Sequence, residues 1–133
     1  YRIAITKEPL ESKKPGWEDV VYIGMTNSQR GLISRWRQFD RAICQGVTGY
    51  HSGGKSLSDK HGKYGGKKWC ESGYHLYVSA IGIECNTKEP TEDDYLAMGL
   101  VACLEYWAFG TFCRAARKRG APVKDRHPMF NTQ

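Results

Sequence analysis

A change of hydrophobic period early in the chain constrains the fold more than any other stretch. The segment DVVYIG, Asp19–Gly24, is a short apolar run that ends at a glycine, which is typical of a buried strand. After a polar turn, apolar residues from Leu32 to Cys44 recur at spacings of three and four, the period of an amphipathic helix. A strand therefore leads into a helix, with Tyr22 near the end of the strand and Arg35 near the start of the helix.

Two more strands and a longer helix are expected elsewhere. Tyr1–Thr6 (YRIAIT) alternates apolar and polar residues, and it should pair with the strand described above as an antiparallel hairpin with a long connection. Tyr74–Ile83 (YHLYVSAIGI) has the clearest strand pattern in the chain. Thr91 and Asp94 form a capping-box-like start for a helix from Glu92 to about Lys118 that is apolar on much of its circumference.

The composition indicates one basic globular domain. A chain of 133 residues and 15.1 kDa suits a single domain over residues 1–133. No apolar run approaches the roughly 20 residues that span a bilayer, so we expect no membrane partner. The chain opens on Tyr1 rather than Met, and we expect that residues precede it. The formal net charge of +6 favours a polyanionic partner, against the alternative of a merely basic surface.

The cysteines indicate a reducing compartment. There are five of them, an odd number, widely spaced and without a C-x-x-C pair. This pattern favours reduced thiols over a disulfide framework or a zinc finger. The expected location is cytoplasmic, at the nucleoid or in the nucleus of a eukaryotic cell.

Glu105 is the most informative single residue. Its neighbours three and four residues away on the predicted helix are apolar: Val101, Ala102, Ala108 and Phe109. Its carboxylate therefore projects from an apolar face. A buried carboxylate is costly unless an arginine or a divalent metal compensates it. A structural ion pair and a metal ligand both remain as interpretations.

Arg35, Tyr1 and Tyr22 could complete a site around Glu105. Arg35 could pair with Glu105 or hold a phosphate with its planar donor fork, and a solvated surface arginine is the alternative. Tyr1 and Tyr22 lie on neighbouring predicted strands, and a phenol can both donate and accept a hydrogen bond to orient a water. For each tyrosine alone, an ordinary place at the edge of a core is the simpler explanation.

The segment 46–68 is rich in Gly, Ser, Lys and His, and we expect loops with a short helix around Ser56–Tyr64. Within it, GYHSGGKS (Gly49–Ser56) fits the phosphate-loop pattern G-x-x-x-x-G-K-[ST], which would place Lys55 in a nucleotide site. That motif works between a buried strand and a helix N-terminus, whereas a helix is predicted before it here. A nucleotide-binding loop is therefore the weaker alternative.

Taken in order, these features resemble the GIY-YIG nuclease family. YRIAI is similar to the stretch that opens with the family's GIY tyrosine, here Tyr1, whose Gly and Ile would precede the first residue. YIG is intact at Tyr22–Gly24, and SRW, Ser34–Trp36, stands where the family carries its helix arginine. HSGGKSLSDKHGKYG resembles the segment that often follows that helix. CLEYW around Glu105 resembles the metal-ligand helix, and PMFN places Asn131 at the closing asparagine.

The resemblance covers essentially the whole chain and implies an α/β (α+β) fold with a small three-stranded, mostly antiparallel sheet flanked by helices. It also implies an endonuclease that hydrolyses DNA phosphodiester bonds. Glu105 would hold one Mg²⁺ or Mn²⁺ ion, and Arg35 would bind the scissile phosphate. Tyr1 and Tyr22 would orient or deprotonate the attacking water, and Asn131 would brace the site by hydrogen bonding.

The implied substrate is DNA, expected to be double-stranded and held by basic side chains. The residues proposed for DNA contact are Arg37, Arg41, His51, Lys55, Lys60, Lys63, Lys67 and Lys68, with Arg114, Arg117, Lys118 and Arg119 as a second patch. For each of them a solvated surface charge is the simpler alternative. The Gly-rich segment 46–68 is the candidate for contact with a groove or with bases.

Two positions depart from the family's pattern. Phe39 stands where many members carry a His or Tyr that helps handle protons, and Met25 follows YIG where others carry Lys or a small polar residue. The change at Phe39 leaves open a slower enzyme, another proton carrier such as His51, or a module that only binds DNA. The sequence predicts neither the oligomeric state nor the cleavage specificity.

Overall fold

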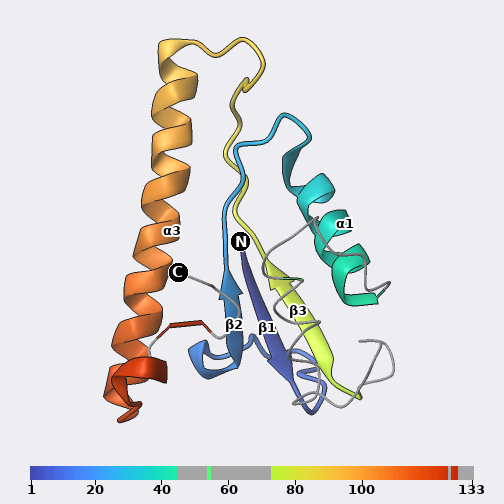
Figure 1. Ribbon diagram of the computed structural model, residues 1–133, viewed down its shortest axis with the longest axis vertical. Helices are drawn as coiled ribbons and strands as arrows, with labels where there is room; N and C mark the ends of the chain where they lie inside the picture. Colours follow the sequence, from blue (N-terminus) through green and yellow to red (C-terminus); the bar gives the residue numbers. More distant parts are fainter. Residues whose placement is uncertain (45–53, 55–72, 126, 129–133) are drawn as a thin grey trace.

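The structure, a computed structural model, describes residues 1–44, 54, 73–125 and 127–128. Three strands form one antiparallel sheet in the order β2-β1-β3 (Figure 1). The strands are β1 (Arg2–Thr6), β2 (Val20–Ile23) and β3 (His75–Ser79). The sheet, together with two long helices, confirms the predicted mixed α and β class and the predicted antiparallel hairpin of β1 and β2.

The two helices cover opposite faces of the sheet (Figure 1). Helix α1 (Gly31–Cys44) packs Phe39 and Ile43 against one face. Helix α3 (Glu92–Lys118) packs Phe112 and Ala116 against the other. Both helices lie where the apolar spacing predicts them, because the positions at spacings of three and four form the face that is buried.

Strand β3 is shorter than the predicted strand over 74–83. Its ladder with β1 runs from His75, opposite Thr6, to Ser79, opposite Arg2. The residues after Ser79 lie outside this ladder, and Ile81 is 75% exposed. At this same end of β1, Tyr1 extends the pairing with the other neighbour, since its backbone exchanges two hydrogen bonds with Gly24 at 2.7 and 2.9 Å.

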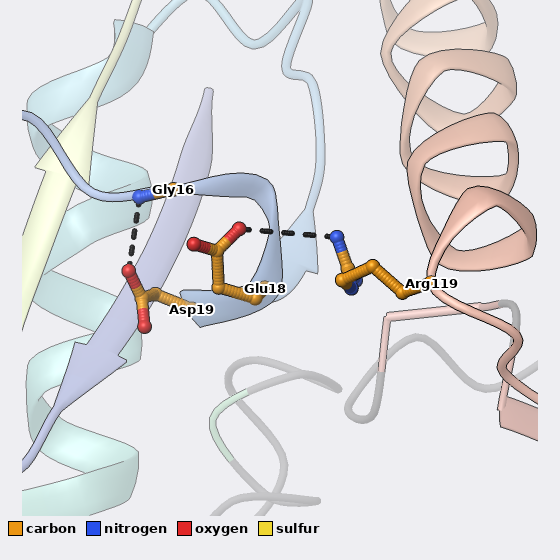
Figure 2. A network of polar contacts seen from close by, with 4 residues as sticks. All are labelled: Gly16, Glu18, Asp19 and Arg119. Carbon is orange, nitrogen blue, oxygen red and sulfur yellow. Dashed lines mark hydrogen bonds and ion pairs between the residues drawn. The ribbon is translucent and has the colours of Figure 1, made fainter.

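A short 3-10 turn, η1 (Trp17–Asp19), connects the hairpin to the end of α3 (Figure 2). The Asp19 carboxylate accepts a hydrogen bond from the Gly16 N–H at 2.9 Å and fixes the turn. Glu18 forms an ion pair with Arg119 at 3.8 Å, just after α3 ends. Both side chains are exposed, so the pair contributes at most about 1 kcal/mol. A second 3-10 turn, η4 (Val123–Asp125), follows α3.

The predicted capping box starts α3. The Thr91 hydroxyl accepts a hydrogen bond from the Asp94 N–H at 3.3 Å, and the Asp94 carboxylate accepts one from the Thr91 N–H at 2.8 Å. Hydrogen bonds from Thr91 and from the Asn86 backbone lower the pKa of Asp94. The helix therefore begins where the sequence indicates, with two of its first donors satisfied.

Much of the apolar surface of α3 faces outward. Large exposed side chains include Tyr95, Leu96, Leu100, Tyr106 and Trp107. By length and composition alone, α3 could cross a membrane. This was not expected from the sequence, because the charged residue Glu105 divides the apolar stretch of α3 into two shorter runs. The core helix of a soluble protein or a signal sequence can have the same length and apolar composition.

Candidate functional site

A β-bulge in β2 decides which face of the sheet carries Tyr22. Ile3 pairs with Tyr22, whereas the next residue, Ala4, pairs with Val20. Val21 is therefore an extra residue in β2. In regular alternation Tyr22 would share the face of Val20, which packs on the α3 side. The bulge shifts the alternation by one residue, and Val21 and Tyr22 both pack on the α1 side.

Gly24 leaves room for the phenol of Tyr22. A Cβ atom on residue 24 would lie 2.6 Å from Cε1 of Tyr22 and 2.9 Å from its Oη. The backbone of Gly24 is not left-handed, so conformational freedom is not the reason for a glycine at this position. The last residue of the YIG segment is glycine because the ring two residues earlier folds over it.

The phenols of Tyr1 and Tyr22 meet the guanidinium of Arg35 on the α1 side of the sheet. The centroids of the two rings are 5.8 Å apart. Burial raises the pKa of the Tyr1 phenol well above its usual range, and the neighbouring Tyr22 phenol adds to the rise, while the hydrogen-bonded guanidinium of Arg35 opposes it. Three of the five predicted site residues therefore converge, and Tyr1 keeps its proton at neutral pH.

Arg35 is held in place with part of its donor fork unused. Its Nη1 donates a hydrogen bond to Oε1 of Gln38 at 3.1 Å, one helical turn further on. Its Nε is buried and has no hydrogen-bond partner in the described part of the chain. There, too, no ion pair joins Arg35 to Glu105, so the pairing considered from the sequence is not observed. A buried donor on a cation is costly to leave unpaired, and a phosphate oxygen would satisfy it.

Phe39 closes the α1 side of this cluster. Its ring centroid lies 6.3 Å from that of Tyr22, and the side chain is buried in the same hydrophobic core. The apolar side chain of Phe39 therefore lies beside Tyr22, at the position where the resemblance implies a proton carrier. His51, the alternative carrier, lies outside the described residues.

Glu105 reaches the same end of the hairpin from α3. Its carboxylate is half-buried and accepts a hydrogen bond from the backbone N–H of Met25. Burial raises the pKa of Glu105, while the Met25 hydrogen bond lowers it. Tyr1 thus has its phenol in the Arg35 cluster and its backbone nitrogen near Glu105, and it connects the two halves of the site.

A cavity of about 520 Å³ opens beside Glu105. It lies between the segment after β2, the extended segment after β3 and the middle of α3, which run alongside one another beyond the sheet (Figure 1). Its walls are mostly apolar, with the charged residues Arg2 and Glu105 among them. Arg2 also lies over the ring of Trp17, 4.9 Å from its centroid. The cavity is large enough to admit part of a substrate next to the carboxylate.

Glu105 suits a single hard cation rather than a protein cage. The described residues contain no group of three or more His, Cys, Asp and Glu side chains that could hold a metal ion. Mg²⁺ is commonly bound by one or two carboxylates, with waters and substrate phosphates completing its octahedral shell. A half-buried carboxylate at the wall of an open cavity fits this mode of binding.

The predicted DNA-contact residues are only partly described. Arg37 and Arg41 are exposed on α1, the helix that carries Arg35. His51, Lys55, Lys60, Lys63, Lys67, Lys68 and the predicted bracing residue Asn131 lie outside the described residues. The second basic patch is exposed at the C-terminal end of α3 and begins at Arg114, about two and a half turns beyond Glu105. It is therefore not brought to the site.

Gly54 bears on the phosphate-loop alternative. It is helical and buried, and a Cβ there would lie 2.7 Å from Cβ of Ala42 and 3.2 Å from the carbonyl oxygen of Phe39. Close packing on α1 therefore accounts for this glycine without a phosphate. The rest of the motif, including Lys55, and the expected short helix over Ser56–Tyr64 lie outside the described residues.

Sequence reasoning missed two contacts that position the site. Gln38 could be found from its three-residue spacing to Arg35 on a predicted helix. The backbone N–H of Met25, which hydrogen-bonds Glu105, carries no side-chain signal at all. Comparison with protein-family models, curated proteins and solved structures gave no match to this chain.

Proposed function

We propose that the chain is a GIY-YIG-like endonuclease that hydrolyses DNA phosphodiester bonds with the help of one divalent cation. The observation that supports this most is the convergence of Tyr1, Tyr22 and Arg35 at the end of the hairpin that Glu105 reaches from the opposite helix. Phosphodiester hydrolysis needs a positive clamp, an oriented water and neutralisation of charge on the leaving oxygen. Each of these tasks has a candidate residue here.

Arg35 is the candidate clamp. Gln38 holds one arm of its guanidinium, and the buried Nε is left without a partner. A phosphate oxygen would accept from this donor, and it would gain charge in the transition state. Arg37 and Arg41 on the same helix would hold flanking phosphates of double-stranded DNA, consistent with the net charge of +6.

The two phenols are assigned different tasks. Tyr1 retains its proton, so it would donate a hydrogen bond and orient the attacking water. Tyr22 would act as a base only as a phenolate, after its own proton has passed to solvent, and it is the phenol to test for this role because the bulge and Gly24 fix its ring beside Tyr1. Asn131 remains the predicted bracing residue.

Glu105 would hold Mg²⁺ or Mn²⁺ at the wall of the cavity. When bound, the cation would neutralise charge on the scissile phosphate and the leaving oxygen. Glu105 must be ionised for this role, and the Met25 hydrogen bond favours the ionised form against the effect of burial. Its raised pKa predicts that acid removes activity earlier than it would for an exposed glutamate.

Plasmid nicking tests the assignment. Glu105→Gln should abolish Mg²⁺-dependent nicking of supercoiled DNA and leave the DNA mobility shift unchanged. Glu84→Gln, at an exposed position, is the matched control and should nick at the wild-type rate. Full nicking by Glu105→Gln would refute the metal assignment.

A non-catalytic DNA-binding module is the second candidate, favoured by Phe39 at the expected proton carrier and by the retained proton on Tyr1. It predicts a mobility shift with no nicking in Mg²⁺, Mn²⁺ or EDTA. The phosphate-loop alternative predicts instead ATP or GTP binding that Lys55→Ala abolishes. The same protein preparation, with nucleotide binding as an additional assay, separates all three.

A further inference from the structure

The outer side of α3 carries a stripe of exposed residues. The exposed positions from Glu92 to Arg117 recur at spacings of three and four, so they share one side of the helix. We call this set the α3 stripe. It begins with acidic residues, Glu92 and Asp93, is apolar in its middle, and ends with basic residues, Arg114 and Arg117.

We propose that two copies of the chain associate through antiparallel α3 stripes, with the two-fold axis beside Cys103. The stripe is balanced about this residue, so positions equally far before and after it face each other in such a pair. Leu96 then faces Gly110, and Gly99 faces Trp107. Large side chains are thereby opposed to glycines, which is the arrangement that lets two helices interdigitate closely.

The charges of the stripe favour a second copy in this direction. In the antiparallel pair Glu92 of each chain faces Arg114 of the other, and both charge pairs are attractive. A parallel pair would place acidic ends together and basic ends together. One surface that is complementary to itself under a two-fold rotation is what an isologous dimer requires.

Gly99 and Gly110 support the same conclusion independently. A Cβ at either position would meet no atom within 4 Å among the described residues, so their packing gives no reason for a glycine. Glycine inside a helix is destabilising relative to alanine. Close approach of Trp107 and Leu96 from a second copy would explain why glycine stands at these two positions.

The apolar area of the stripe is sufficient for a dimer. Leu96 is 72%, Tyr106 75% and Trp107 62% exposed. An aromatic side chain buries roughly 150–250 Å² when covered. These side chains, with Leu100, supply on the order of 500 Å² of the about 800 Å² that each partner buries in a standard interface. The flanks of a 27-residue helix can provide the remainder.

A lipid surface is the competing occupant, because α3 is long and apolar enough to cross a membrane. The opposite side of α3, however, packs against the sheet through Phe112 and Ala116, so lipid could not surround the helix. Anionic headgroups would attract the basic end of the stripe but repel its acidic start, whereas an antiparallel second copy pairs both ends favourably. A second copy therefore fits the stripe better than a bilayer.

Sedimentation equilibrium of the whole chain tests the proposal. We expect twice the chain mass of 15.1 kDa, and Gly110→Leu should raise the dimer dissociation constant at least about tenfold by overfilling the interface. Gly82→Leu is the matched control, since that exposed glycine also has open space around it but lies outside α3. Circular dichroism should show that both variants keep the helix content of the parent chain.

Cross-linking tests the position of the axis. No disulfide joins the described cysteines, and Cys103 is the exposed one among them. A short bismaleimide should link two chains, and Cys103→Ser should lose the link. If Gly110→Leu does not fold, Arg114→Glu should weaken the dimer, and adding Glu92→Arg should restore it.

Three results would overturn the proposal. They are a monomer at all concentrations, a dimer indifferent to both the Gly110 and the Arg114 substitutions, and binding of the chain to phosphatidylcholine–phosphatidylglycerol vesicles that Trp107→Ser abolishes. None of these tests involves Tyr1, Tyr22, Arg35 or Glu105. The outcome is therefore independent of whether the chain is a nuclease.

Discussion

The ring of Tyr22 occupies the space that a side chain on residue 24 would need, with its Cε1 2.6 Å from the Cβ that Gly24 lacks. The bulge in β2 turns this ring toward α1, where the phenol of Tyr1 and the guanidinium of Arg35 lie. Within the YIG segment, the missing side chain at Gly24 therefore determines where the ring of Tyr22 can lie.

Gly24→Ala should move the Tyr22 ring away from Tyr1 and Arg35. We expect the nicking rate to fall at least tenfold and the free energy of unfolding to drop by about 1–3 kcal/mol, since the added methyl group overfills the site. Plasmid nicking and urea unfolding measure the two effects. Gly82→Ala, which meets open space, is the control, and equal behaviour of the two variants would contradict the steric explanation.

Arg35→Lys should lower the cleavage rate by about 100-fold, because lysine keeps the charge but lacks the planar fork that a phosphate would engage. DNA binding should change much less, since other basic residues hold the flanking phosphates. Single-turnover cleavage and mobility shift separate the two quantities. Arg37→Lys, two residues away and exposed, should cleave normally. If it cleaves as slowly as Arg35→Lys, Arg35 is not the specific ligand of the scissile phosphate.

Glu105→Gln should stabilise the fold at neutral pH while it removes activity. The folded-state pKa of Glu105 is raised above the ordinary 4.5, so its favourable contribution is complete below pH 4.5 and is lost as pH rises through the folded-state value. Above that pKa the ionised carboxylate lowers the free energy of unfolding, and the uncharged glutamine side chain does not. Urea midpoints should differ little at pH 4 and increasingly toward pH 7; a constant difference would show that burial does not shift this group.

Tyr1→Phe should flatten the alkaline limb of the stability profile. In the folded chain the phenol keeps its proton above the ordinary pKa of 10.0, whereas the unfolded chain releases it there. Rising pH above 10 therefore favours the unfolded state of the parent chain more than that of the variant. Urea unfolding between pH 8 and 11 shows the slope, with Tyr95→Phe, an exposed position, expected to match the parent chain.

The helices and the hairpin could be predicted from periodicity because their apolar spacing matches the faces they bury. The capping box placed the start of α3 at Glu92 for the same local reason. β3 was predicted too long, since its pairing with β1 stops at Ser79 whereas the alternating pattern continues to Ile83. An alternating pattern shows that a segment can form a strand, and pairing with a neighbouring strand decides how much of it does so.

The site was less accessible to prediction. The order of Tyr1, Tyr22, Arg35 and Glu105 in the sequence indicates a shared role, but the face on which Tyr22 lies depends on a bulge that no residue type announces. The partner of Glu105 is a backbone N–H rather than the arginine considered from the sequence. Contacts made by the backbone depend on tertiary geometry, and composition does not record them.

The bulge at Val21 also has a consequence for how β2 can vary. Deleting Val21 would remove the bulge and restore regular alternation, with Val20 still opposite Ala4 and Tyr22 still opposite Ile3, so the phenol would stay on the α1 side. Exchanges among apolar residues at Val20 or Val21 would likewise leave Tyr22 on its present face of the sheet. The faces of Val20 and Tyr22 therefore follow from their partners on β1, and β2 can lose its extra residue without moving the phenol.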